Sequence, residues 1–267
     1  MRTLIYLILC AIIISCAPKK VKEEQQPAEK TPVVTVKRDA RKIGPAKSAE
    51  QILIEDAIAK IETNKNDPAV GYWVGMFGKN KINVAIAEVK DGQALGYTVC
   101  AGNFRPITGQ VQIDGDVYKF DMNEPGTDQY DGHFEFTINI ANDDLTGKWS
   151  PFKKDKVAAK DFALTKVRYV YQPGVGTYPE ASSRILEEGD VSNLLKEELQ
   201  LMRNEIYARH GYSFKDLADR RYFDTIQWYI PMGVDIRQNL TDVEVENIDL
   251  IYEYENYSDD HYDGYGR

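Results

Sequence analysis

The sequence predicts an α+β protein, in which an antiparallel β barrel or sandwich of about eight strands precedes a small, mainly helical C-terminal domain. Apolar and polar residues alternate between about Val70 and Val167, which is the pattern of half-buried strands. Further along, apolar residues recur at helical spacing, and Thr241 and Glu244 have the spacing of a helix capping box. These two patterns define the fold class.

The N-terminal segment indicates export. Arg2 is followed by an apolar stretch from Leu4 to Ile14, which is shorter than the roughly 20 residues that a membrane-spanning helix needs. This arrangement is typical of a secretory signal peptide. The end of the stretch reads Ile-Ile-Ser-Cys and resembles the lipobox of bacterial lipoproteins, which implies that Cys16 receives a diacylglyceryl group before cleavage. An ordinary signal peptide with an incidental cysteine is the alternative.

We therefore expect residues 1–15 to be a signal peptide and residues 16–47 to be a lipidated, flexible tether. The tether is rich in Lys, Glu, Gln and Pro, and cannot bury enough apolar surface to offset its ordering entropy. Several acyl chains on Cys16 would hold the protein at a membrane without a spanning helix. Residue 17 is Ala rather than the Asp that retains enterobacterial lipoproteins in the inner membrane. Ala17 therefore favours the outer membrane, on its periplasmic or surface face.

Composition restricts the possible partners. The chain has 33 Lys and Arg against 42 Asp and Glu, a net charge of −9, which argues against nucleic acid as a partner. Cys100 would be the one cysteine outside the signal and the anchor, and we interpret it as a buried thiol. The residues His133, His210 and His261 lack metal-ligand spacing, so we expect no metal and no cofactor.

A short helix is predicted over residues 48–67. Ser48 is a good N-cap, Gln51 has the capping-box spacing, and an apolar face follows, formed by Ile54, Ala57, Ile58 and Ile61.

The β domain is predicted over residues 68–170. Phe134–Ile140 alternates strictly, and Asp91-Gly92 and Asp114-Gly115 have the composition of two-residue hairpin turns. Gly71-Tyr72-Trp73 resembles the Gly-x-Trp of lipocalins, which implies a ligand cavity that would be lined by Val84, Ile86, Phe134 and Phe136. We interpret the acidic loop 124–132 as a solvated turn rather than a calcium or glycan site.

The C-terminal region contains the string Tyr-Ala-Arg-His-Gly at residues 207–211. This string, together with Arg221-Tyr222-Phe223, Trp228-Tyr229 and Leu240–Glu244, resembles the YARHG domain family of bacterial extracytoplasmic proteins. The resemblance covers residues 185–256. It implies a small, mainly helical module that is often attached to other envelope modules and has no established activity.

Two interpretations remain open for the predicted helix that ends in the Tyr-Ala-Arg-His-Gly string. An apolar stripe of Leu195, Leu199, Met202 and Ile206 predicts which face is buried. The polar residues beside it form either a binding surface or a buried network that sets the turn after the helix, with Arg and Asn bonding loop carbonyls; we favour the network. Catalysis by His210 would need a nucleophile or a carboxylate brought close by the fold, because Glu205 lies on the opposite flank of the helix. The candidate binding residues are Arg203, Asn204, Glu205, Tyr207, Arg209, His210 and Trp228.

The first functional hypothesis is a non-enzymatic, membrane-anchored envelope lipoprotein that binds or scaffolds an envelope protein or glycan. One alternative is a lipocalin-like carrier of a small apolar ligand in the β domain. Another is a cell-wall hydrolase. Residues 257–267 alternate Tyr with Asp and Gly, and we expect them to form a frayed acidic tail.

Overall fold

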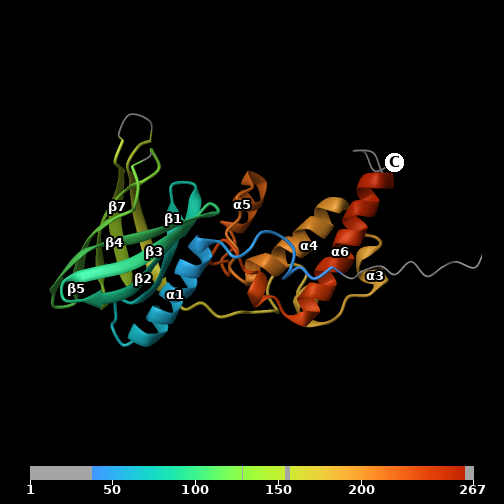
Figure 1. Ribbon diagram of the computed structural model, residues 1–267, viewed down its shortest axis with the longest axis horizontal. Coiled ribbons are helices and arrows are strands. Elements are labelled where there is room, and N and C mark those ends of the chain that lie inside the picture. Colours follow the sequence, from blue (N-terminus) through green and yellow to red (C-terminus); the bar gives the residue numbers. More distant parts are fainter. Residues whose placement is uncertain (1–37, 128, 154–156, 262–267) are drawn as a thin grey trace, which may run out of the picture. The chain divides into compact units, whose positions relative to one another are not determined.

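An eight-stranded antiparallel barrel followed by a group of helices makes up the computed structural model, which describes residues 38–127, 129–153 and 157–261 (Figure 1). The predicted α+β class is confirmed, and the strands form a closed barrel rather than a sandwich. The predicted signal peptide, Cys16 and the tether up to residue 37 lie outside the described residues.

Every strand of the barrel pairs with its neighbour in the sequence, and β1 pairs with β8 to close it. The turn at Asp91 and Gly92 has the positive φ angles, 51° and 73°, that its composition predicts. The next predicted turn is shifted by one residue, because Asp114 still pairs with Val117. The strands are β1 Gly71–Phe77, β2 Asn80–Lys90, β3 Gln93–Cys100, β4 Asn103–Asp114, β5 Val117–Asn123, β6 Gly132–Asn139, β7 Asp144–Pro151 and β8 Lys160–Val167.

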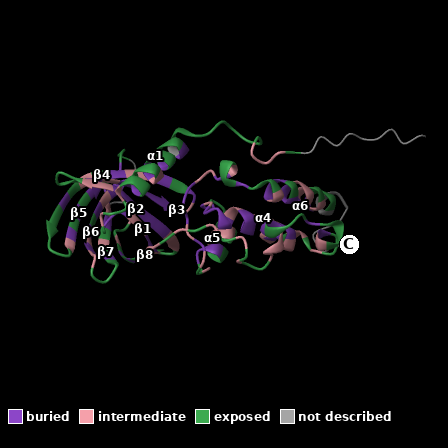
Figure 2. Ribbon diagram, turned by 90° about the horizontal axis from the view of Figure 1, so that it is seen from below, coloured by how far each residue is buried: buried purple, intermediate pink, exposed green. Residues whose placement is uncertain are grey.

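The barrel interior is a packed core. Phe134, Phe136 and Ile138 of β6 are at most 4% exposed, which confirms the alternation read from the sequence. Along β5, buried and exposed residues likewise alternate (Figure 2). A glycine stands opposite a large side chain where the barrel is crowded: a Cβ at Gly147 would collide with Phe136 across the strand pair.

Strand β2 is buried on both faces. The helix α1, Ala49–Asn64, packs over β2 and also contacts β3 and β4. Ala85 and Ala87 on β2 are therefore fully buried, and Asn64 donates a hydrogen bond to the Ala87 carbonyl. Ser48 caps α1 as predicted, but the Gln51 side chain accepts a hydrogen bond from the backbone of Asp235 in the C-terminal region.

The C-terminal region is built around two long helices that pack against each other, α4 and α6. Their contact buries Leu199, Met202 and Ile206 of α4 against Ile248 and Ile251 of α6. None of the described helices has both the length and the apolar character to cross a membrane. The helical elements are α2 Glu180–Ser183, α3 Glu188–Val191, α4 Lys196–Arg209, α5 Leu217–Phe223, the 3-10 helix η1 Arg237–Asn239 and α6 Asp242–His261.

Two predictions for these helices are wrong in detail. Leu195 is 66% exposed, because it precedes the first turn of α4 instead of joining the apolar stripe. The predicted tail at 257–267 is helical as far as His261, since extending an established helix costs far less than starting one. Residues 262–267 lie outside the described part.

Hydrogen bonds also join the barrel to the loop between α5 and η1. Lys81 on β2 donates to the carbonyls of Ile226 and Tyr229, and Asn83 donates to the carbonyl of Pro231. At the β3–β4 turn, Gly102 donates its backbone N–H to the Ser213 hydroxyl. These contacts cover polar and apolar groups on the outer face of the barrel that would otherwise be solvated.

Candidate functional site

The Tyr-Ala-Arg-His-Gly motif forms the last turn of α4 and the chain reversal that follows. Gly211 has a φ of +74°, and a Cβ at this position would lie 2.6 Å from the Cβ of Met232. Ala208 is buried beside an aromatic cluster of Phe214, Phe223 and Tyr229. Both small residues are therefore required by the backbone path and by the packing around it.

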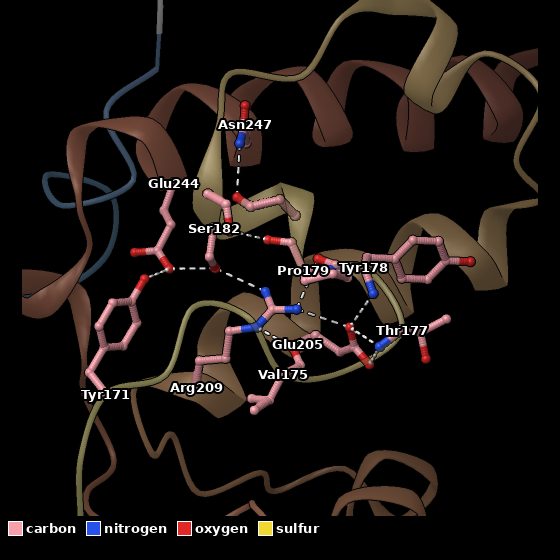
Figure 3. A network of polar contacts seen from close by, with 12 residues as sticks. Tyr171, Val175, Thr177, Tyr178, Pro179, Ser182, Glu205, Arg209, Glu244 and Asn247 are labelled. Carbon is pink, nitrogen blue, oxygen red and sulfur yellow. Dashed lines mark hydrogen bonds and ion pairs between the residues drawn. The ribbon is translucent and has the colours of Figure 1, made fainter.

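Arg209 lies at the centre of a buried polar network (Figure 3). It forms an ion pair with Glu205, one helical turn earlier, at 3.1 Å between Nη2 and Oε2. Its other hydrogen bonds go to the carbonyls of Val175 and Tyr178 and to the Ser182 hydroxyl, all at 2.9 Å. The Arg209 side chain is 0% exposed, so every partner of the guanidinium belongs to the protein itself.

Glu205 holds the start of the C-terminal region. Its carboxylate accepts hydrogen bonds from the backbone N–H groups of Thr177 and Tyr178, at 2.8–2.9 Å. Gly176 has a φ of +99°, and a Cβ there would lie 2.6 Å from a Glu205 oxygen. The domain therefore begins earlier than the predicted residue 185, because the motif helix binds the segment at 175–178 directly.

The motif histidine binds the other long helix. Nε2 of His210 lies 2.6 Å from Oε2 of Glu244, and the His210 ring stacks on Tyr171 with 4.5 Å between ring centres. The other oxygen of Glu244 accepts hydrogen bonds from the hydroxyls of Tyr171 and Ser182. Burial favours a higher pKa for Glu244, but the hydrogen bond and charge of His210 together with the bonds from Thr241 and Ser182 outweigh it, so the pKa is lowered.

The favoured interpretation of a buried network therefore describes Glu205, Arg209 and His210, which are at most 4% exposed. Arg209 bonds loop carbonyls as expected. The fold does bring a carboxylate to His210, but Glu244 is 0% exposed, so a substrate has no access to the pair. The His210–Glu244 pair is therefore a structural contact between two helices.

The remaining candidates on α4 line a surface groove. Arg203, Asn204 and Tyr207 form one wall of a groove of about 640 Å³, and Tyr212 and Tyr252 contribute further aromatic surface. The rest of the lining comes from the segment at 40–48, the segment at 212–219 and the segment at 234–240. The candidate residues are thus divided between a buried network and an open groove.

Arg203 is fixed in the groove wall by α6. Its guanidinium forms two hydrogen bonds to Glu255, at 2.9 and 3.2 Å, and lies 4.6 Å from the ring centre of Tyr252. Asn204 donates a hydrogen bond to Asp219 at 3.0 Å and accepts one from Arg203. The expectation that Arg and Asn at these positions bond loop carbonyls is therefore wrong for both, because their partners are side chains of α5 and α6.

The charges in the groove are balanced. Three cationic residues, Arg203, Lys215 and Arg237, stand beside three acidic residues in the lining, Asp216, Asp219 and Asp235. Asp235 is paired with Arg237, which lowers the pKa of Asp235, whereas burial raises the pKa of Asp219.

Trp228 does not belong to the groove. Its ring packs edge-on against Phe223 at 6.5 Å between ring centres, on the side of the aromatic cluster. Conversely, the groove residues Tyr212, Tyr252 and Asp219 are not among the candidates predicted from the sequence. The density of tyrosines in the C-terminal region was the available signal, but spacing alone could not show which of them share a surface. In the described part of the chain, no group of three or more His, Cys, Asp or Glu is arranged to hold a metal ion.

The fold and the site define a two-module protein, in which a closed barrel is followed by a helical module with an interior ion-pair network. That module is a YARHG domain: residues 176–256 match this family. The match starts at the glycine beside Glu205, which agrees with the structural beginning of the network. Neither curated proteins nor solved structures gave a match to the chain.

Proposed function

We propose that this protein is a non-enzymatic lipoprotein of the bacterial cell envelope, and that the groove of its YARHG domain binds an envelope glycan. The observation that carries the proposal is the lining of the groove, where Tyr207, Tyr212 and Tyr252 stand beside Asn204 and the acidic residues. The volume of about 640 Å³ falls within the range of small-molecule sites.

The lining favours a glycan over a protein partner. A sugar ring has an apolar C–H face, which packs on aromatic rings, and a rim of hydroxyl groups, which exchange hydrogen bonds with amides and carboxylates. Balanced charge in the groove offers no electrostatic preference for a charged peptide. A neutral ligand with many hydroxyl groups matches this chemistry best.

The end of the predicted tether supports display of the domain. Arg41 forms an ion pair with Asp242 at the start of α6, at 2.7 Å, and Arg237 donates a hydrogen bond to the Ile43 carbonyl. The segment at 40–48 is therefore bound along the edge of the groove. An anchor at Cys16 would hold the domain at the membrane through this segment.

The groove carboxylates favour a binding role over hydrolysis. Asp235 is bound to Arg237, Asp219 to Asn204, and Asp216 caps α5 through the N–H groups of Ala218 and Asp219. A glycosidase needs two carboxyl groups free to act on the glycosidic bond. Each of these three groups already has a structural partner.

The experiment is a calorimetric titration of the mature chain with soluble glycan strands of peptidoglycan. We expect saturable binding, and at least a ten-fold loss of affinity in Tyr212→Leu and in Tyr252→Leu, which keep apolar bulk but lose the aromatic ring. Tyr222→Leu is the matched control, because Tyr222 is an exposed tyrosine of the same domain outside the groove. Absence of binding by the wild type, or equal affinity in all three variants, would contradict the proposal.

A further inference from the structure

A second cavity, of about 410 Å³, opens at one end of the barrel. It lies near the β1–β2 and β3–β4 turns, and its lining includes Asn80 at the start of β2 and Ala101 in the β3–β4 turn. Phe77, Phe134 and Trp149 contribute aromatic surface from inside the barrel. The Phe77 ring contacts the other two, lying 5.9 Å from Trp149 and 6.2 Å from Phe134 between ring centres.

The cavity is a mouth and does not continue through the barrel. Val84, Ile138 and Leu145 fill the interior beyond it and are 0% exposed. Of the residues expected to line a carrier's cavity, Phe134 borders the mouth, whereas Val84, Ile86 and Phe136 do not. A ligand here is limited in size and sits at the rim, with part of its surface toward solvent.

One cation in this mouth has no carboxylate partner. The ammonium group of Lys160 lies 4.3 Å from the ring centre of Phe77 and 5.5 Å from that of Trp149. Within residues 38–127, 129–153 and 157–261, no acidic side chain forms an ion pair with it. Its ammonium therefore stands over an aromatic surface and remains available to an anion.

The other charged groups of the mouth are already engaged. Arg105 forms an ion pair with Asp131, at 3.4 Å. Glu124 accepts hydrogen bonds from the Trp149 indole and from the Gly132 N–H, and burial raises the pKa of its carboxyl group. Glu124 is thus held by Trp149 and Gly132, and among the described residues it forms no ion pair with Lys160.

We infer that the barrel mouth binds a small organic anion, with an aromatic or alkyl body against Phe77, Phe134 and Trp149 and its anionic group on Lys160. This site is separate from the groove of the YARHG domain and shares no lining residue with it. The inference therefore stands or falls independently of glycan binding. It also differs from a carrier of a purely apolar ligand, because the charge of Lys160 selects an anion.

The test compares two fluorescent probes that share one ring system. 8-Anilinonaphthalene-1-sulfonate carries an anionic group, and N-phenyl-1-naphthylamine is its neutral counterpart. We expect the mature protein to bind the sulfonate at least ten-fold more tightly than the neutral probe, with energy transfer from Trp149 because this indole lines the site.

Variants assign the preference to one side chain. Lys160→Met keeps an unbranched side chain one atom shorter and removes the charge, so it should remove the ten-fold preference while binding of the neutral probe changes less than two-fold. Lys160→Arg should retain the preference. Lys119→Met is the control, since Lys119 is exposed on strand β5 and lies outside the mouth. An equal affinity of the wild type for both probes, or an unchanged preference in Lys160→Met, would overturn the inference.

Discussion

His210 and Glu244 lie 2.6 Å apart between Nε2 and Oε2, and this contact joins the end of α4 to the first turn of α6. The same Glu244 oxygen accepts the backbone N–H of Thr241, whose hydroxyl in turn accepts the N–H of Glu244. The capping box of α6 and the contact to the motif are thus made by one carboxylate. Loss of the Glu244 charge therefore affects both at once.

The acid stability of the protein should depend on Glu244. Its pKa in the folded state is lowered from the ordinary 4.5, so it contributes stability above pH 4.5 that is lost as the pH falls through the folded value. Glu244→Gln should lower stability at neutral pH and flatten the decline on the acid side. Urea unfolding between pH 3 and pH 7, about the ordinary range of carboxyl titration, measures both effects. A variant whose acid decline parallels the wild type would contradict this assignment.

Arg209→Met should destabilise the domain strongly. It leaves Glu205 buried without its ion-pair partner, and breaking such a pair costs about 3–5 kcal/mol. Arg184→Met is the matched control, because Arg184 pairs with Asp190 through two hydrogen bonds but is 50% exposed; we expect a loss of at most about 1 kcal/mol. Denaturant unfolding monitored by circular dichroism distinguishes them. Similar losses for both arginines would refute the buried-network interpretation.

Gly211→Ala should lower the free energy of unfolding by more than the positive φ alone explains. A Cβ there would lie 2.6 Å from Met232 and 2.9 Å from the Ile230 carbonyl, in addition to the unfavourable φ of +74°. Gly115→Ala also has a positive φ, +58°, but its Cβ would meet open space, so we expect a loss of about 1–2 kcal/mol there. Thermal melts of the two variants should differ by several degrees; coincident melts would argue against the clash.

Arg203 and Glu255 should show measurable coupling. Their side chains are only 15% and 8% exposed and share two hydrogen bonds. A double-mutant cycle with Arg203→Ala and Glu255→Ala should give a coupling free energy of about 1–3 kcal/mol. Additive effects of the two substitutions would mean that the groove wall is held by packing on Tyr252 alone.

Cys16→Ala should release the chain from the membrane. The prediction depends on the lipobox resemblance, since an unacylated chain would lose the proposed anchor. Fractionation of cells that express the wild type and the variant measures the outcome. Retention of the variant in the membrane after washing with high salt and mild alkali would contradict lipid anchoring.

Local patterns predicted the elements well where burial is one-sided. Phe134–Ile140 alternates because one face of β6 meets the core, and Thr241 with Glu244 marks the start of α6. Strand β2 is harder to interpret, because α1 and the segment near Pro231 bury its outer face as well. Closure of the barrel depends on the β1–β8 pairing, which no local pattern encodes.

The partners of the motif could not be derived from spacing either. Glu244 is 34 residues from His210, and Ser182 is 27 residues from Arg209. Helical periodicity places Arg209 and His210 on faces of α4, but says nothing about which distant segment covers each face. For this reason the sequence suggested a polar cluster correctly and yet could not separate its buried members from those that line the groove.

The β1–β8 pairing also determines where the chain enters and leaves the barrel. Tyr72 pairs with Val167, so the first and last strands begin and end side by side. A unit with adjacent ends can be inserted into a loop, or excised from it, without displacing what flanks it. The barrel therefore has the geometry of an insertable unit, and its contacts to the C-terminal region include those of Lys81, Asn83 and Gly102.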